Sequence, residues 1–337
     1  MTAFPNIRLR RKRLSNWLLN LTRENELSIN DLILPLFVHN GTEIYEPITG
    51  LPNIKCYPIA NLLSVIEKAK NLGINAIAIF PVVENNFKTE NASEAYNPDN
   101  LICSAIRQVK SEFESNIGII ADVALDPYSI HGHDGVVIDG KIANDETIPI
   151  LCKQALVLAA AGCDVVAPSD MMDGRIQAIR TALDNSNFQD VLILSYAVKY
   201  CSGFYAPFRQ AVGSCSFSSS IDKSSYQLDF GNTKEAMCEI QMDIDEAADI
   251  IMIKPGMPYL DVIRAAADKF DIPIFAYQVS GEYAMLKAAS EKGWLEYDKV
   301  IYESLLSFKR AGAKSIFTYA ALEIAELSRL YRQCKFL

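Results

Sequence analysis

Residues 249–254 read DIIMIK, a short apolar run that ends in Lys254. A second run, VLIL (191–194), comes shortly before Lys199. Apolar runs without alternation are typical of parallel strands that are covered on both faces. An amine at the end of such a strand loses hydration, so its pKa falls toward the range in which a neutral nucleophile exists at pH 7. Two such lysines facing one pocket should lower each other's pKa further.

Similar runs recur along the whole chain, and each is followed by a stretch with helical periodicity. The eight strand candidates are 32–38, 75–80, 117–123, 164–168, 190–196, 249–254, 273–279 and 314–319. The helix candidates include 59–72, 99–115, 147–161, 172–184, 232–247, 258–269, 281–292 and 321–333. Gly73, Gly162 and Gly312 stand where helix C-caps are expected. The pattern predicts a (β/α)8 TIM barrel. The alternative is a doubly wound open sheet, but no Gly-rich phosphate loop follows an early strand.

Composition narrows the class of protein. Of 337 residues, half are hydrophobic and 22% are charged, which favours a large core over disorder. A net charge of -9 argues against nucleic-acid binding. No run reaches the roughly 18 to 20 apolar residues of a spanning helix, and no signal-peptide stretch is visible at the start. We therefore expect a soluble, cytoplasmic protein without membrane partners. Its eight dispersed cysteines, without a CxxC pair, are expected to be reduced.

The N-terminus departs from this acidic composition. Arg8 and the run RRKR (10–13) form a basic segment, followed by the apolar WLL (17–19). A nucleic-acid patch or an organelle transit peptide would have this composition, but the favoured interpretation is an arm that lies on an acidic neighbour. We therefore divide the chain into an arm, residues 1–30, and a single barrel domain, residues 31–337.

Polar and reactive side chains are concentrated where the predicted strands end. They are Asp122, Asp126, His131, His133, Asp134, Ser169, Asp170, Ser195, Tyr196, Lys199, Lys254, Gln278, Ser280, Thr318 and Tyr319. In a barrel of this type, catalytic groups lie at the C-terminal ends of the strands. The distribution indicates an enzyme and favours a catalytic role for both lysines over solvated amines.

Several long strings at these places resemble the porphobilinogen synthase family. They are SEAYNPD (93–99), APSDMMDGR (167–175), SYAVKY (195–200), FYAPFR (204–209), MIKPGMPYLD (252–261) and AYQVSGEYAML (276–286). The resemblance extends from the basic arm to the last helix. It implies a lyase of tetrapyrrole and heme biosynthesis, which condenses two molecules of 5-aminolevulinate into porphobilinogen and releases two waters.

The resemblance also implies a role for individual residues. Lys254 would form the Schiff base with the substrate that supplies the propionate side of the product, and Lys199 with the acetate-side substrate. The other residues implied are Asp122, Asp126 and Ser169 in catalysis, Arg209, Lys223 and Gln227 on the acetate-side carboxylate, and Ser280 and Tyr319 on the other carboxylate. Many relatives carry arginine at position 223, and lysine lacks its bidentate fork. Residues 213–227 would form a lid over the substrate.

One departure concerns metals. Zinc-dependent members place three cysteines where this chain has Ala124, Asp126 and Asp134. Without thiolates, we expect no catalytic zinc. Asp126 and Asp134 could instead orient the substrate amine or bind magnesium, a monovalent cation such as potassium, or water. His131 and His133 could suggest a metal, but hydrogen-bonded structural histidines are the favoured interpretation.

A second metal position is implied by the resemblance alone. Members without the zinc cysteines often bind an allosteric magnesium ion through a carboxylate that matches Glu239. One carboxylate and several waters suit Mg²⁺, although Glu239 could equally be an ordinary glutamate on a helix surface. In the family this ion favours a homo-octamer in which the arm wraps a neighbouring barrel.

Two alternative functions remain open at this point. A class I aldolase-type barrel would use one of the two lysines, and a catalytically silent barrel would serve as a scaffold. The pair of lysines with two carboxylate anchors separates the first from the leading hypothesis. A silent barrel should have lost some of these residues, yet all of them are present together.

Overall fold

The computed structural model describes residues 4–43, 50–211 and 221–334. Its main feature is a closed parallel barrel, because β11 (Ser315–Thr318) pairs with β1 (Leu32–His39). The other barrel strands are β3 (Ala76–Pro81), β4 (Gly118–Val123), β7 (Val165–Pro168), β8 (Leu192–Lys199), β9 (Ile250–Lys254) and β10 (Ile274–Gln278). The short β2 (Cys56–Pro58) pairs with the end of β1. The predicted (β/α)8 barrel is confirmed and the open-sheet alternative is wrong.

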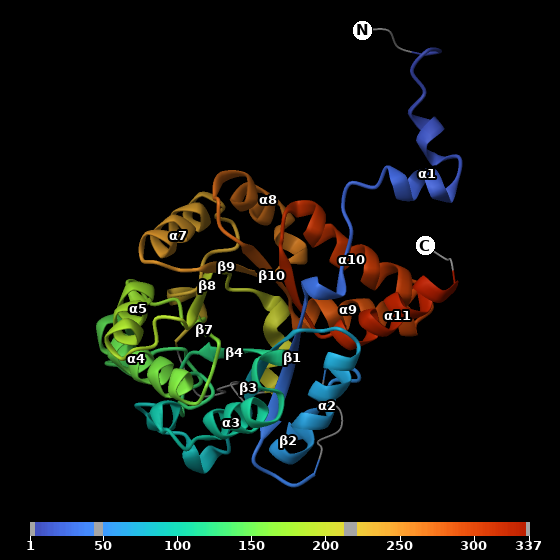
Figure 1. Ribbon diagram of the computed structural model, residues 1–337. Helices are drawn as coiled ribbons and strands as arrows, with labels where there is room; N and C mark the ends of the chain where they lie inside the picture. The colour runs from blue at the N-terminus through green and yellow to red at the C-terminus, as the bar shows by residue number, and fades with distance from the viewer. Residues whose placement is uncertain (1–3, 44–49, 212–220, 335–337) are drawn as a thin grey trace.

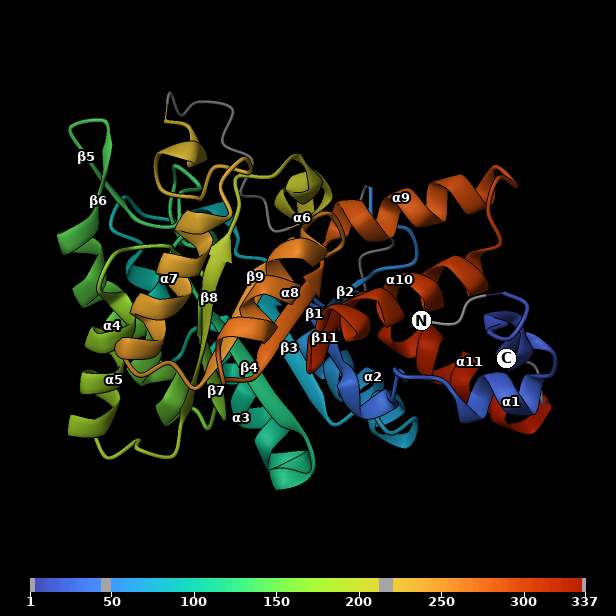
Figure 2. The same cartoon turned by 90° about the horizontal axis from the view of Figure 1, so that it is seen from above.

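Helices cover the outside of the barrel (Figure 1). They are α2 (Ile59–Asn71), α3 (Leu101–Phe113), α4 (Asn144–Ala160), α5 (Arg175–Asn185), α6 (Ala206–Ala211), α7 (Lys234–Asp245), α8 (Leu260–Lys269), α9 (Ser280–Glu291), α10 (Tyr297–Ala311) and α11 (Ala321–Cys334). Figure 2, turned by 90° from that view, shows α6 beside the start of α9.

The sequence explains these elements locally. All eight residues of β1 are buried, which accounts for its continuous apolar run. In α3 the buried positions include Ile102, Ile106 and Val109, which repeat at helical spacing and face the barrel. The helix α10 ends at Gly312, whose φ of 113° and close approach to Ala267 leave no room for a side chain.

Three features differ from the sequence expectation. The helix α10 was not foreseen as an element of its own, although its C-cap at Gly312 was. The strand β8 extends to Lys199 itself rather than ending at Tyr196, and its register to β9 shifts between Ser195 and Val198. A small antiparallel hairpin, β5 (Val136–Ile138) and β6 (Lys141–Ala143), follows β4.

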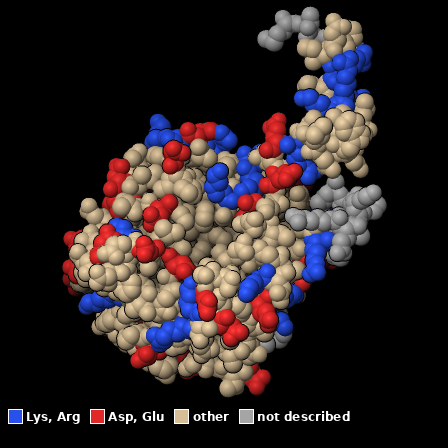
Figure 3. Space-filling model, viewed as in Figure 1, with Lys and Arg blue, Asp and Glu red and all other residues tan. Residues whose placement is uncertain are grey.

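The N-terminal segment extends away from the barrel (Figures 1 and 2). It contains a 3-10 helix, Leu9–Arg13, and α1 (Asn16–Leu21), and neither has a buried residue. Basic side chains are grouped on this segment in Figure 3. The side chain of Trp17 is 67% exposed, so the chain itself does not bury the apolar part of the arm.

Two findings concern membranes and thiols. Over the ranges that the structure describes, no helix combines the length and apolar character needed to cross a bilayer. The free cysteines found there are Cys56, Cys103, Cys152, Cys163, Cys201 and Cys238. Cys215 lies outside the described residues.

A layer of aromatic rings fills the barrel near the ends of its strands. Phe37, Phe80, Tyr277 and Tyr319 are buried, and their neighbouring ring centroids lie 6.1 to 6.5 Å apart. Rings of this size exclude water and lower the local dielectric. Phe80 also lines the pocket above this layer, so charged groups in that pocket stand on an apolar floor.

Candidate active site

One pocket at the C-terminal ends of the strands collects most of the predicted site residues. Eight of the ten predicted catalytic and substrate-binding residues line it. They are Asp122, Asp126, Ser169, Lys199, Arg209, Lys223, Gln227 and Lys254. They come from strands and loops widely separated in the sequence, which the barrel brings to one place.

The two lysines lie on neighbouring strands. Lys199 ends β8 and Lys254 ends β9, and their Cα atoms are direct partners in the parallel register. Each is less than a tenth exposed. Two amines in this arrangement can engage two carbonyl compounds side by side.

Lys254 is surrounded by rings. Its Nζ lies 4.7 to 5.3 Å from the ring centroids of Tyr196, Tyr205, Phe208 and Tyr277. Burial, and after it the charge of Lys199, lowers the pKa of Lys254 to about 7 despite the opposing carboxylates. The sequence prediction of a depressed pKa is therefore confirmed for this residue. A substantial fraction of the amine is neutral at pH 7, as a nucleophile requires.

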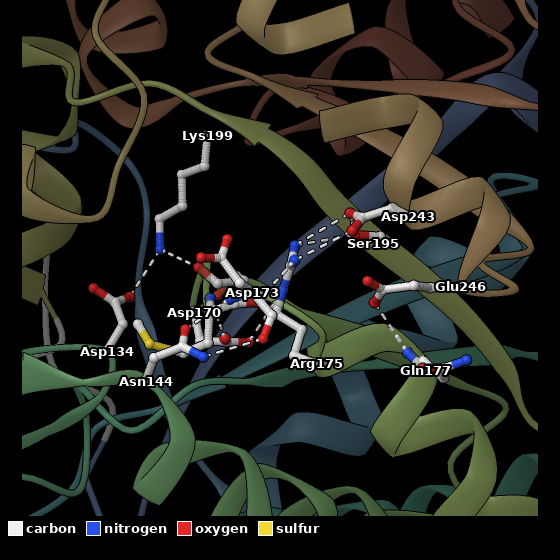
Figure 4. Close-up of polar contacts among 12 residues, drawn as sticks. Asp134, Asn144, Asp170, Asp173, Arg175, Gln177, Ser195, Lys199, Asp243 and Glu246 are labelled. Atoms are coloured by element: carbon white, nitrogen blue, oxygen red, sulfur yellow. Dashed lines mark hydrogen bonds and ion pairs between the residues drawn. The ribbon is translucent and has the colours of Figure 1, made fainter. Parts of the chain in front are cut away.

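Lys199 differs from Lys254 in its charge. Its Nζ donates to Asp134 Oδ1 at 2.8 Å and to the Ser169 carbonyl at 2.5 Å; the contact with Asp134 is drawn in Figure 4. Burial lowers its pKa, but Asp134 and Asp126 outweigh burial and raise it above the ordinary value. The prediction that both lysines have a depressed pKa is wrong for Lys199, because an opposite charge in contact outweighs desolvation.

The carboxyl groups of the pocket also differ from one another. Asp134 accepts hydrogen bonds from Lys199, Lys223 and Tyr226, and the two lysines outweigh burial and hold its pKa well below the usual range. Burial, and then the nearby charge of Asp126, raises the pKa of Asp122 to about 7. The site therefore contains one firmly ionised carboxylate and one carboxyl group that can exchange protons near neutral pH.

The predicted carboxylate anchors fall into two groups. Arg209 places its guanidinium over the Tyr205 ring, and its buried Nη2 has no hydrogen-bond partner among the described residues. Lys223 is paired with Asp134 at 2.8 Å. An incoming carboxylate would accept a hydrogen bond from the unpaired Nη2 of Arg209, and it would compete with Asp134 for Lys223. Of the predicted lid, residues 213–220 lie outside the described part of the chain.

Ser280 and Tyr319 are fully enclosed beside the pocket. The Ser280 hydroxyl accepts from the Phe208 N–H at 3.0 Å and donates to the Phe204 carbonyl at 3.3 Å. The Tyr319 hydroxyl lies 3.2 Å from that of Tyr277, whose ring contacts the Lys254 amine. Both hydroxyls therefore stand on the Lys254 side of the site, and their role toward a substrate stays a prediction.

The two histidines are held by hydrogen bonds. His133 Nδ1 lies 3.2 Å from the Tyr226 hydroxyl, and the His133 N–H donates to His131 Nδ1. Burial, and then Lys223, lowers the pKa of His133 to about 4. Within the described ranges, no three His, Cys, Asp or Glu side chains are arranged to hold a metal ion.

Glu239 lies away from this pocket, on α7 at the outer face of the barrel. Burial raises its pKa to about 7; Arg175 opposes this effect and Asp243 adds to it. Figure 4 shows Arg175 joined to Asp243 and Ser195. A desolvated carboxylate of this kind would gain from a cation, because the cation would stabilise its charged form.

The comparisons with known proteins agree with this geometry. The family model of delta-aminolevulinic acid dehydratase matches residues 6–327. The chain belongs to this family. It is 50% identical to a delta-aminolevulinic acid dehydratase of Bradyrhizobium diazoefficiens, over 96% of this chain and 91% of the relative. An Archaeoglobus fulgidus dehydratase is 45% identical over 97% and 99% of the two chains.

A solved structure of the family is also similar. The delta-aminolevulinic acid dehydratase of Toxoplasma gondii, in complex with its reaction product porphobilinogen, has a TM-score of 0.95 and 45% identity. The match covers 98% of this chain and 94% of that one. The recognised family is therefore confirmed by sequence and by fold.

Sequence reasoning did not find every functional neighbour. Tyr226 was not singled out, and of the rings around Lys254 only Tyr196 was named, although FYAPFR (204–209) contains two of the others. No local sequence pattern predicts the group of rings around Lys254, because Tyr196, Tyr205 and Tyr277 come from three separate segments. Asp134 was noted, but its ion pairs with two lysines depend on tertiary structure.

Proposed function

We propose that this dehydratase condenses two molecules of 5-aminolevulinate into porphobilinogen, with loss of two waters, through Schiff bases on Lys254 and Lys199. The observation that carries the proposal is the pair of buried amines in direct register on β8 and β9. A single-lysine aldolase would need only one of them, and a scaffold would need neither.

The opposite charge states of the lysines suit two different substrates. Neutral Lys254 can attack a ketone directly, and the carbinolamine then needs a proton to release water. Asp122, with its pKa near 7, can give that proton. Lys199 must first lose a proton, because Asp134 and Asp126 favour its charged form, and it is therefore expected to react more slowly than Lys254.

The anchors would keep the two substrates distinct. Arg209, Lys223 and Gln227 line the pocket, where Lys223 shares Asp134 with Lys199, and they would hold the acetate-side carboxylate. Tyr319 contacts Tyr277 and Ser280 contacts Phe208, and the rings of Tyr277 and Phe208 both lie against Lys254, so Ser280 and Tyr319 would hold the propionate-side carboxylate. Asp126 and Ser169 line the same pocket and complete the proposed catalytic set.

Finer properties belong to the same proposal. The chemistry makes the enzyme a hydro-lyase of tetrapyrrole biosynthesis. Free thiols suit a cytoplasmic location. The exposed apolar side chains of the arm support a homo-octamer in which the arm lies on a neighbouring copy. The desolvated Glu239 supports an allosteric Mg²⁺ site, since one carboxylate and several waters suffice for this ion.

Trapping the two Schiff bases tests the central claim. The protein is incubated with 5-aminolevulinate, reduced with borohydride and digested, and the modified lysines are mapped by mass spectrometry. We expect adducts on Lys254 and Lys199. Absence of an adduct on Lys254 would overturn the mechanism, and an adduct on Lys254 alone would favour the aldolase-type alternative.

A further inference from the structure

Glu282 is a buried carboxylate that the proposed reaction does not use. It lies in the first turn of α9 and is fully inaccessible to solvent. Within the described part of the chain its carboxylate has no ion-pair partner, and backbone N–H groups alone hold it. Burial raises the pKa of Glu282 to about 8, against the stabilising effect of those N–H groups. A buried carboxyl group whose charged form has no counter-charge is costly to keep, so its presence requires a reason.

The hydrogen bonds of Glu282 join two segments. One oxygen accepts the N–H of Met257 at 2.7 Å, and the other accepts the N–H of Val279 at 2.6 Å. Gly256 contributes a further backbone hydrogen bond. The loop 254–257 begins at Lys254, whereas Val279 directly precedes Ser280. One carboxylate thus fastens the loop of the amine to the start of the helix that carries a predicted carboxylate anchor.

A capping role alone does not account for this residue. A helix N-terminus is ordinarily satisfied by a short Ser, Thr, Asp or Asn at the N-cap, which is near water. Here the N-cap is Val279, which has no side-chain acceptor, and Glu282 reaches across to a different strand end. The oxygen that accepts from the Met257 N–H does not cap α9. It holds the loop after β9.

Both segments approach their neighbours closely. A Cβ on Gly256 would overlap the Phe308 ring, and a Cβ on Gly281 would overlap the Phe204 backbone. The Lys254 carbonyl is fixed in turn by the Tyr205 hydroxyl at 3.1 Å and the Tyr200 N–H at 3.0 Å. Glu282 is therefore a polar link between two closely packed backbone segments.

We propose that Glu282 is a positioning residue that sets the spacing between the Lys254 amine and Ser280, and so matches the site to a keto acid of one length. This proposal rests on the proposed function, in which Lys254 and Ser280 hold the same substrate. A displacement of about 1 Å in such an arrangement can cost about a hundredfold in rate.

The test compares two ketones at Lys254. Butanone carries only the carbonyl, whereas 4-oxopentanoate carries the carbonyl and a carboxylate at substrate length. Timed borohydride reduction and mass spectrometry give the rate of adduct formation at Lys254 for each. In the unaltered protein we expect 4-oxopentanoate to react faster. In Glu282→Gln one N–H faces an amide NH2 instead of an oxygen, and we expect the preference for 4-oxopentanoate to fall about tenfold or more.

The control is Glu323→Gln. Glu323 accepts from Lys287 and from the Tyr297 hydroxyl, so it links the same helices α9, α10 and α11 without touching the loop of Lys254. Its loss should lower the melting temperature and leave the preference unchanged. If Glu282→Gln yields no folded protein, Glu282→Asp replaces it. Aspartate keeps the carboxyl group but is one methylene too short to reach both segments.

Two outcomes are decisive. If Glu282→Gln, or Glu282→Asp in its place, slows both ketones equally, or changes only the melting temperature as Glu323→Gln does, the positioning role is wrong. If the unaltered protein forms no adduct at Lys254, the proposed function itself has failed. The two failures are distinct, because the second is observed without any substitution.

Discussion

The charge state of Lys254 gives the sharpest prediction, since its pKa near 7 separates it from ordinary lysines. The perturbation is a change of pH from 6 to 8 during reaction with 4-oxopentanoate. The carboxyl group of 4-oxopentanoate, with a pKa of about 4 to 5, stays ionised over this range, and the compound has no amine that titrates. Any change in rate then reports on the protein.

The expected magnitude follows from the neutral fraction of the amine. With a pKa of about 7, roughly one tenth of Lys254 is neutral at pH 6 and roughly nine tenths at pH 8, so the rate rises about tenfold and then levels off. A lysine of ordinary pKa, about 10.4, would instead give a rise of about a hundredfold with no plateau. The shape of the curve separates the two cases.

The assay is timed reduction with borohydride followed by quantification of the Lys254 peptide. Because Asp122 titrates in the same range, the midpoint belongs to the coupled pair. Two variants separate the contributions. Lys199→Met removes a like charge and should move the midpoint up, whereas Asp122→Asn removes an opposite charge and should move it down. A steady hundredfold rise, or shifts of the same sign in both variants, would refute the reasoning.

Three further predictions concern the ion pairs and the metals. Asp134→Asn leaves two lysines without their partner and should lower the free energy of unfolding by about 3 to 5 kcal/mol at pH 7. Because the folded pKa of Asp134 is depressed, its contribution exists above about pH 4 and is lost as the pH falls through the folded value, so denaturant melts should show the difference shrinking in acid. Phenanthroline should leave the activity intact; inhibition that only zinc reverses would contradict a site without thiolates. EDTA should lower the activity or the octamer fraction, measured by sedimentation, and Glu239→Ala should abolish the response to added Mg²⁺.

The sequence predicted the barrel well because of how its strands are covered. A parallel strand buried on both faces needs apolar residues at every position, so β1 and β9 are readable without any partner. The end of β8 was placed too early, at Tyr196. The strand continues to Lys199 through a shift in its register to β9 between Ser195 and Val198. Such an irregularity depends on the neighbouring strand and has no signature in the sequence of β8 itself.

The site was predictable in its membership but not in its charges. Position at a strand end places Lys199 and Lys254 in one pocket, and that much follows from the barrel. Their pKa values depend on which carboxylate each amine touches, and Asp134 reaches Lys199 only through the loop after β4. The desolvation rule therefore held for Lys254, whose amine is surrounded by rings, and failed for Lys199.

The difference between the two lysines has a consequence for the order of events. They are register partners on adjacent strands, so their backbone positions are equivalent. The difference between their pKa values therefore arises from the side chains around each amine. Lys254 can attack a ketone as it stands, whereas Lys199 is held as a cation by Asp134 until that pair is disturbed. A carboxylate that binds Lys223 would not release it, because withdrawing Lys223 from the shared Asp134 leaves more uncompensated negative charge beside Lys199. We therefore expect the first adduct on Lys254 and a slower adduct on Lys199, with 4-oxopentanoate and with butanone alike. Adducts mapped at short times with both ketones test this order; labelling of Lys199 as fast as that of Lys254 would show that Asp134 does not control Lys199.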